Sequence, residues 1–244
     1  AMSWTTALEA LKVRIGALGK SSVKAVVSPF WSNEDLGAVS RLVEALGGGS
    51  IVFRSARAEE EVVLQGYEGL ARRKALAPNG HGAELLGCTR VGDDLGQGGL
   101  EDLMDHEGVV LVLGDALDDQ PEDFAPNAGL VLYLGAYTSS ALASVDFQLP
   151  VTTFAEQEGT FTNHAGRVQR FWPALSGPGA ARPAWLVLGA LMGALQGEDG
   201  PNTAEKAFDL VAQAIKSYKG LDYETIGAQG GPSGAPVPVP VPGD

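Results

Sequence analysis

Short apolar runs that stop at proline or glycine, separated by stretches with helical spacing, restrict the possible folds of this chain most. Val23 to Ser28 is such a run and Pro29 ends it, because proline cannot donate a backbone hydrogen bond to a neighbouring strand. Residues 36–46 then place leucine and valine at helical spacing, and glycines lead into the apolar run Ile51 to Phe53. This order predicts a right-handed βαβ unit.

Three further apolar runs extend the unit into a larger sheet. Val109 to Leu113 is the most continuous, which is typical of a central parallel strand buried on both faces. Leu130 to Leu134 follows, and Val145 to Leu149 ends at Pro150. We therefore predict an α/β fold with a Rossmann-like, mostly parallel sheet flanked by helices.

Other helical spacings indicate which segments cover the sheet. Ser3 and Thr203 are suited to cap helices, because a hydroxyl oxygen accepts a bond from a free N–H of the first turn. A third helix is expected around Trp185 to Leu195, whose large apolar side chains share one face. Glu59 to Ala71 is also expected to be helical, with its valines facing inward.

The segment after Pro150 predicts a β-hairpin with a polar tip. Thr160 to Thr162 and Arg167 to Phe171 are extended pieces, and Asn163 to Gly166 has the polar, glycine-containing composition of a turn. The tip would present Asn163, His164 and Arg167 beside a sheet edge. Pattern alone favours a plain hairpin whose polar tip is exposed over a ligand-binding loop.

The C-terminal stretch from Gly227 to Asp244 alternates proline with small residues. Such a composition favours extended polyproline conformations and offers little apolar surface to a core. We expect one α/β domain over residues 1–226 and a flexible, disordered Gly/Pro-rich tail over residues 227–244.

Charge and cysteine content limit the function classes. The formal net charge of −13 repels nucleic-acid phosphates and anionic lipid headgroups. No run approaches the roughly 18 apolar residues that cross a bilayer. We therefore expect no nucleic-acid partner, no direct membrane insertion and a cytoplasmic location.

A catalytic or metal site finds little support in the sequence. The single cysteine, Cys88, allows neither an intrachain disulfide nor a multi-cysteine cluster site. The three histidines lie far apart, and no G-x-S-x-G motif is present. We predict no catalytic residue and no metal ligand.

Asp115 stands where dinucleotide folds contact ribose. It follows the predicted central strand, and a carboxylate at the carboxyl end of a strand can accept bonds from ribose hydroxyls. A simple turn residue would occupy the same position. Both interpretations stay open.

The run from Glu156 to Gln169, EQEGTFTNHAGRVQ, resembles the signature E-x-x-GTF-x-N-x-x-[GR]-R-V-Q of the molybdopterin oxidoreductase family. Gly166-Arg167 is the detail that separates its branches. Formate dehydrogenase-like members tend to carry two arginines there. The large iron–sulfur subunits (G subunits) of NADH-quinone oxidoreductase, respiratory complex I, carry glycine and arginine. This chain is therefore most similar to the G-subunit branch.

That resemblance implies a non-catalytic structural and interaction module of the complex I peripheral arm. The partners would be other peripheral-arm subunits, the location peripheral to the inner membrane, and the chain would hold no cofactor of its own. Thr160, Asn163, Gly166 and Arg167 would form a vestigial pterin-site loop.

The alternative that the family offers is a fragment of a formate dehydrogenase-type molybdenum oxidoreductase that binds molybdopterin guanine dinucleotide. Thr160, Asn163 and Arg167 would then contact the cofactor. A free-standing binder of a small ligand at the strand ends is a third interpretation, and it rests on the fold alone.

Overall fold

The structure, a computed structural model, describes residues 2–67 and 71–234. Its centre is a six-stranded sheet in the order β5-β2-β1-β6-β7-β8, and every neighbouring pair is parallel. Val23 of β1 pairs with Gly49 of β2 on one side and Val109 of β6 on the other. The strands are β1 (Val23–Val27), β2 (Gly49–Phe53), β5 (Thr89–Arg90), β6 (Val109–Leu113), β7 (Leu130–Gly135) and β8 (Phe147–Pro150).

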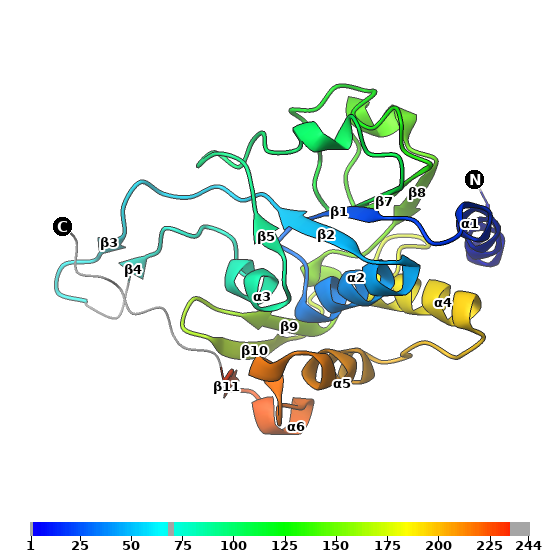
Figure 1. Ribbon diagram of the computed structural model, residues 1–244. Coiled ribbons are helices and arrows are strands. Elements are labelled where there is room, and N and C mark those ends of the chain that lie inside the picture. Colours follow the sequence, from blue (N-terminus) through cyan, green and yellow to red (C-terminus); the bar gives the residue numbers. More distant parts are fainter. Residues whose placement is uncertain (1, 68–70, 235–244) are drawn as a thin grey trace.

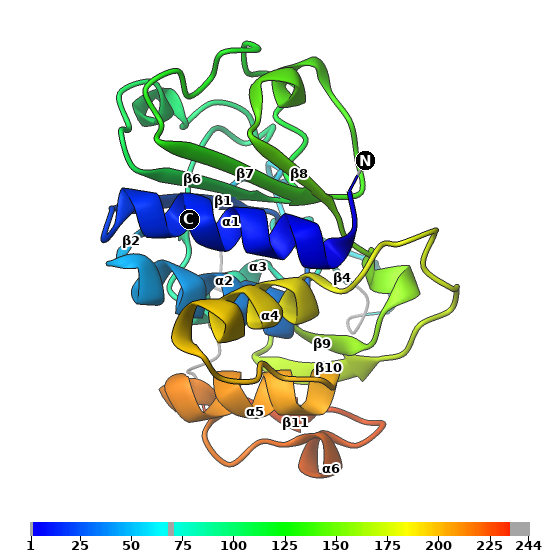
Figure 2. The same ribbon diagram turned by 90° about the vertical axis from the view of Figure 1, so that its right-hand side faces the viewer.

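The two faces of this sheet are covered differently (Figures 1 and 2). One face packs against three helices, α1 (Trp4–Leu18), α2 (Asn33–Leu46) and α4 (Ala184–Gln196). The other face is covered by loops with the short 3-10 helices η1 (Glu101–Leu103) and η2 (Ser140–Ser144). The predicted α/β fold with a Rossmann-like parallel sheet is thus confirmed.

A second, antiparallel sheet lies beyond α2. It is formed by β9 (Gly159–Thr162), β10 (Arg167–Phe171) and β11 (Gly231–Pro232). Val168 pairs with Thr162, which confirms the predicted hairpin. Val168 also pairs with Gly231, so residues expected to belong to the flexible tail form a strand on β10. Residues 235–244 of that expected tail lie outside the described residues.

Further short elements complete the fold. Figure 2 places α5 on the far side of α2 and α4 from the main sheet. These elements are α3 (Gly80–Leu85), α5 (Ala204–Ala214), α6 (Tyr223–Ile226), η3 (Phe154–Glu156) and η4 (Lys216–Tyr218). The predicted caps are present, because Ser3 Oγ accepts from Thr6 N and Thr203 Oγ1 accepts from Lys206 N.

The helix predicted over Glu59 to Ala71 is wrong. The structure has an arm that projects from the body (Figure 1), with β3 (Val62–Val63) antiparallel to β4 (Ala71–Arg72); residues 68–70 lie outside the described part. Val62 and Val63 are 43% and 53% exposed, so the arm has no core face that would stabilise a helix. Two adjacent β-branched residues also favour strand over helix.

A buried polar network joins α2 to the hairpin and to α6. Glu34, in the first turn of α2, is 1% exposed. Its carboxylate accepts bonds from Thr160 N at 2.8 Å, Thr160 Oγ1 at 3.0 Å and Tyr223 OH at 2.9 Å. The Asn33 side-chain amide donates to the hydroxyls of Thr160 and Thr162, both at 3.0 Å. The first turn of α2 therefore fixes the position of β9.

Asp35 extends the network to α4. Its carboxylate accepts from Ser32 Oγ at 2.7 Å, Gln157 Nε2 at 2.6 Å and Trp185 N at 2.9 Å. Trp185 N is one of the backbone donors that a helix cannot satisfy at its own N-terminus. Asp35 therefore caps its own helix together with Ser32 and also satisfies the start of α4.

Two helical glycines provide a matched test of packing. An alanine Cβ at Gly37 in α2 would lie 2.3 Å from Val211 Cγ2 of α5, whereas at Gly16 in α1 it would meet nothing within 4 Å. We expect Gly37→Ala to destabilise by about 1–3 kcal/mol through overpacking. Gly16→Ala should stabilise by about 0.5–1 kcal/mol through reduced chain entropy. Urea unfolding measures both, and equal effects would contradict this packing of α5 on α2.

Glu34 is expected to make stability depend on pH. Burial raises the pKa of Glu34 from 4.5 to about 7, so the folded state binds this proton more tightly than the unfolded state. Its contribution to the free energy of unfolding is therefore greatest below about pH 4.5 and falls by roughly 3 kcal/mol as pH rises through 7. Glu34→Gln should flatten this slope.

Urea unfolding between pH 5 and pH 8 measures the effect. Glu9→Gln, at an exposed position of α1, is the matched control and should keep the wild-type slope. An unchanged slope in Glu34→Gln would show that the pH dependence originates elsewhere.

Candidate functional site

The carboxyl ends of the parallel strands are the first place to look for a site. The strand order places β2 on one side of β1 and β6 on the other. The order in which strands are added to the sheet therefore reverses at β1. Open α/β sheets bind ligands beside such a switch point. The loops after β1 and β6 meet there.

Trp31 fills the space between these two loops. Its side chain follows β1 and is 4% exposed. Gly114 follows β6 with φ of +73°, and a Cβ at this glycine would lie 2.2 Å from Trp31 Cζ3. The carbonyl of Trp31 accepts from Asn79 Nδ2 at 2.9 Å. The indole ring therefore needs glycine at position 114 and occupies the place where a bound group would meet the β6 loop.

The N-terminus of α2 is closed to an anion as well. A helix N-terminus binds phosphate through its free N–H groups and positive dipole end. Here Asp35 N donates to Ser32 Oγ at 3.1 Å, and the carboxylates of Glu34 and Asp35 are buried in the same turn. These carboxylates already complement the helix dipole, so a pyrophosphate does not fit beside them.

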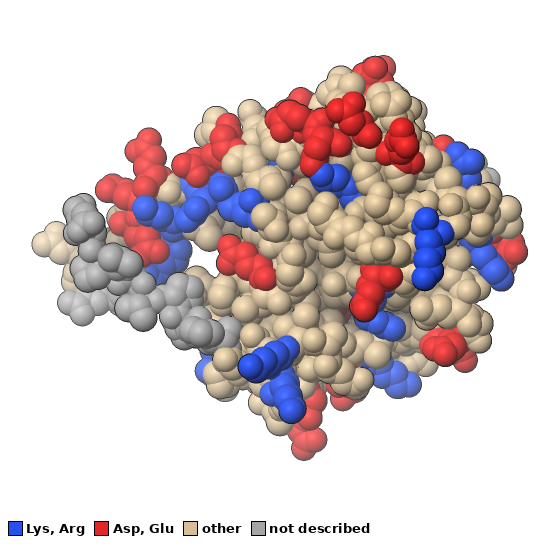
Figure 3. Space-filling view, viewed as in Figure 1, with Lys and Arg blue, Asp and Glu red and all other residues tan. Residues whose placement is uncertain are grey.

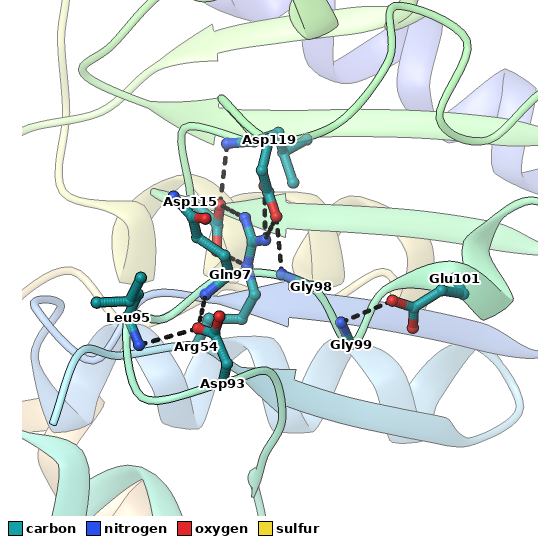
Figure 4. Close-up of polar contacts among 10 residues, drawn as sticks. Arg54, Asp93, Leu95, Gln97, Gly98, Gly99, Glu101, Asp115 and Asp119 are labelled. Atoms are coloured by element: carbon teal, nitrogen blue, oxygen red, sulfur yellow. Dashed lines mark hydrogen bonds and ion pairs between the residues drawn. The ribbon is translucent and has the colours of Figure 1, made fainter.

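Asp115 is engaged by Arg54, a residue that no sequence pattern singled out (Figure 4). The Arg54 guanidinium donates to both carboxylate oxygens of Asp115, with Nε–Oδ2 at 3.0 Å and Nη2–Oδ1 at 2.6 Å. Leu117 N donates to the same carboxylate at 2.9 Å. Arg54 follows β2 directly, so a basic residue immediately after a predicted strand was the available signal.

Asp119 completes this ion-pair cluster. Arg54 Nη1 donates to it at 2.6 Å, and Gly98 N donates to it at 2.8 Å. Burial alone would raise the pKa of Asp119, but the bonds from Arg54 and Gly98 outweigh it and lower the pKa. The ends of β2 and β6 are therefore tied together by one buried guanidinium.

The four residues predicted for the hairpin loop separate into two groups. Thr160 is fully buried in the network at α2. Asn163, Gly166 and Arg167 meet at the tip, where Asn163 Oδ1 accepts from Ala165 N at 2.9 Å and from Arg167 N at 3.0 Å. Gly166 has φ of +69°, which suits glycine in this turn.

Arg167 binds the C-terminal strand. Its guanidinium donates to the carbonyl of Gln229 at 2.7 Å and to that of Gly230 at 2.6 Å. Both carbonyls precede β11, so Arg167 holds this segment against β10. Asp115 belongs to the Arg54 cluster and is not among the tip residues.

A cleft of about 620 Å³ lies beside the hairpin tip. Asn163, His164 and Ala165 line it together with residues of the arm, α3 and the ends of β2 and β5. Figure 3 shows basic side chains gathered where the arm joins the body, with acidic ones around them. The basic residues lining the cleft are Arg57, Arg73, Lys74 and Arg90.

Within the described part of the chain, possible metal ligands are dispersed and the thiol of Cys88 is buried. No three His, Cys, Asp or Glu side chains among residues 2–67 and 71–234 lie close enough to hold a metal ion. Cys88 is 5% exposed, and burial raises the pKa of its thiol to about 12. Over the same residues, no helix is long and apolar enough to cross a membrane.

Comparison with known sequences adds a family similarity. Residues 98–194 match the family model Molybdopterin oxidoreductase. This segment runs from the loop before β6 through the hairpin into α4, so it includes Asp115 and the tip residues.

Individual relatives are similar to this chain over a small part of their own length. F420-dependent formate dehydrogenase 2 subunit alpha of Methanococcus maripaludis is 38% identical over 87 residues, 35% of this chain and 13% of the relative. F420-dependent formate dehydrogenase 1 subunit alpha of the same organism is 32% identical over 103 residues, 41% of this chain and 15% of the relative.

A third relative is a component of NADH-quinone oxidoreductase. It is the G subunit 2 of that enzyme from Rhizobium meliloti, and it is 28% identical over 129 residues, 50% of this chain and 15% of the relative. The matches thus span 13% to 15% of the length of these three proteins. Over residues 98–194 the chain is similar to the molybdopterin oxidoreductases, and its relatives include both formate dehydrogenase and NADH-quinone oxidoreductase components.

Proposed function

We propose that the chain is a non-catalytic structural and interaction module of NADH-quinone oxidoreductase, of the G-subunit type. It would support neighbouring electron-transferring subunits of the peripheral arm and be held at the inner membrane through them. The similarity to the Rhizobium G subunit 2 supports this assignment, as does the Gly166-Arg167 pair in the hairpin.

The main support for the proposal is that side chains of the protein fill the switch point beside β1. A molybdopterin guanine dinucleotide needs donors for its phosphates and room at the strand ends. Trp31 occupies that room against Gly114, and Asp115 is held by Arg54. The buried Trp31 Nε1 has no hydrogen-bond partner among the described residues, but one neutral donor does not make a phosphate site. These residues do not fit the cofactor.

The hairpin residues lead to the same conclusion. Thr160 is bonded to Glu34, and Arg167 is bonded to two backbone carbonyls. A pterin at this loop would have to break these bonds and leave the carboxylate of Glu34 buried with fewer donors, which is costly. The loop chemistry therefore supports a structural role.

An exposed aromatic patch at the base of the hairpin offers a docking surface. Phe154, Trp172 and Leu175 are 50%, 52% and 63% exposed. They are adjacent, because Ala174 N and Leu175 N both donate to the carbonyl of Ala155. Arg170 stacks over Trp172 at 5.0 Å. Clusters of exposed aromatic residues with arginine are typical of protein interfaces.

The second candidate is a fragment of a formate dehydrogenase-type molybdenum oxidoreductase that binds molybdopterin guanine dinucleotide. The higher identities to two formate dehydrogenase alpha subunits favour it. It requires Trp31 to leave the switch point when the cofactor binds.

Co-expression with peripheral-arm subunits of NADH-quinone oxidoreductase tests the docking role. We expect the chain to co-purify with them, and the double variant Trp172→Ala/Leu175→Ala to lower the recovered complex by roughly tenfold, since an exposed tryptophan is a typical interface anchor. Leu95→Ala is the matched control, because Leu95 is 74% exposed but lies in the loop before η1. If the chain purifies without any of these subunits in every preparation, the proposal is wrong.

Cofactor analysis separates the two candidates. The chain is produced in a host that makes molybdopterin guanine dinucleotide, and the purified protein is assayed for molybdenum and for fluorescent oxidised pterin. We expect less than roughly 0.1 equivalent of either, because the switch point holds Trp31 rather than phosphate donors. Stoichiometric pterin would establish the second candidate instead.

A further inference from the structure

The cleft beside the hairpin tip collects positive charge on an acidic protein. The chain has 17 lysines and arginines against 30 carboxylates. Four of these cations line one cleft, and among the described residues its lining includes two carboxylates, Glu61 and Glu84. The cations all lie within residues 57–90, where the two sides of the arm and the end of β5 bring them to one cleft.

Two of the four cations have no ion-pair or hydrogen-bond partner for their side chains within the described residues. Arg73 donates to Glu61 at 3.0 Å, and Arg90 donates to the carbonyls of Ser55 and Asp93 and pairs with the carboxylate of Asp94 at 3.5 Å. Arg57 and Lys74 are exposed, and their side chains form no ion pair or hydrogen bond within residues 2–67 and 71–234. Their charges are available to a ligand.

Buried polar atoms in the same lining also lack partners. His81 Nε2 and Arg90 Nε are buried without a hydrogen-bond partner in the described part of the chain. Buried polar groups are nearly always paired, so each such atom calls for an explanation, of which an unseen ligand is one.

The charges nearest His164 act in the same sense as this excess of cations. Burial is the main cause that lowers the pKa of His164, and the charge of Arg73 lowers it further, against a weaker opposite effect of Glu61. Of these two charges, the positive one therefore has the larger effect on the imidazole.

We propose that this cleft binds a small phosphate-bearing molecule, with Arg57 and Lys74 holding the phosphate oxygens. A volume of about 620 Å³ lies in the range of roughly 300–1,000 Å³ that small-ligand sites occupy. Arginine forms paired bonds to phosphate, and lysine adds a compact positive charge. The site lies on the β2 and β5 side of the sheet and does not depend on the docking role proposed above.

Phosphate fits the cleft better than a single carboxylate does. Arg57 and Lys74 line it from the two sides of the arm, where Arg57 forms an isolated bridge with Ala75, the residue after Lys74. A phosphate or diphosphate offers several oxygens to bind both at once, whereas one carboxylate has two.

Titration calorimetry with inorganic pyrophosphate at low ionic strength tests the proposal. We expect binding that weakens as salt is added, because the contacts are partly exposed charges. The double variant Arg57→Ala/Lys74→Ala should weaken binding by roughly tenfold or more, and Lys74→Gln by less. Arg72→Ala is the matched control, since Arg72 is a neighbouring exposed arginine that does not line the cleft.

Three results would overturn the inference. Pyrophosphate binding could be unaffected in the double variant, or reduced equally in Arg72→Ala, which would reflect net charge alone. An oligoglutamate peptide that binds more tightly than pyrophosphate would make the occupant an acidic chain segment instead. Unchanged thermal unfolding of each variant excludes loss of fold, which is expected because both mutated side chains are exposed.

Discussion

The buried carboxylates of Glu34 and Asp35 are the constraint on which the rest of the structure depends. A buried carboxylate is tolerated only when several donors surround it. These donors come from Thr160, Gln157 and Trp185, more than 120 residues away along the chain. The hairpin, η3 and the start of α4 must therefore converge on the first turn of α2, and the second sheet is fixed to the first.

This convergence also closes the place where an α/β sheet would bind a dinucleotide. The first turn of α2 is covered by β9, the loop after β1 turns Trp31 inward, and Arg54 ties the ends of β2 and β6 together. In α/β sheets that bind dinucleotides, these places hold a phosphate at a helix N-terminus, a ring in the crevice and a ribose at a strand-end carboxylate. In this chain protein groups occupy them.

Local signals predicted most of the fold and little of the site. Apolar runs indicated the strands, since burial on both faces requires a continuous run such as Val109 to Leu113. In the arm, residues 59–67 do not follow the helical spacing, because Val62 and Val63 are exposed there and no core face stabilises a helix over these residues. Thr160 was expected in a pterin-site loop, and its pairing with Glu34 was not foreseen because the two are 126 positions apart. The role of Arg54 was not foreseen either, because its partner Asp115 is 61 positions away. Pairings at such separations leave no trace in local periodicity.

The position of unengaged charge distinguishes the two regions that could receive a ligand. At the switch point Arg54 is paired with Asp115 and Asp119, and Asp35 accepts from several donors, so an arriving anion would have to displace existing bonds. In the cleft beside the hairpin tip, Arg57 and Lys74 lack such partners within the described residues, so an anion binds without breaking any contact. Electrostatics therefore directs anionic ligands away from the strand-end crevice and toward the arm, where the fold has gathered cations on a chain of net charge −13.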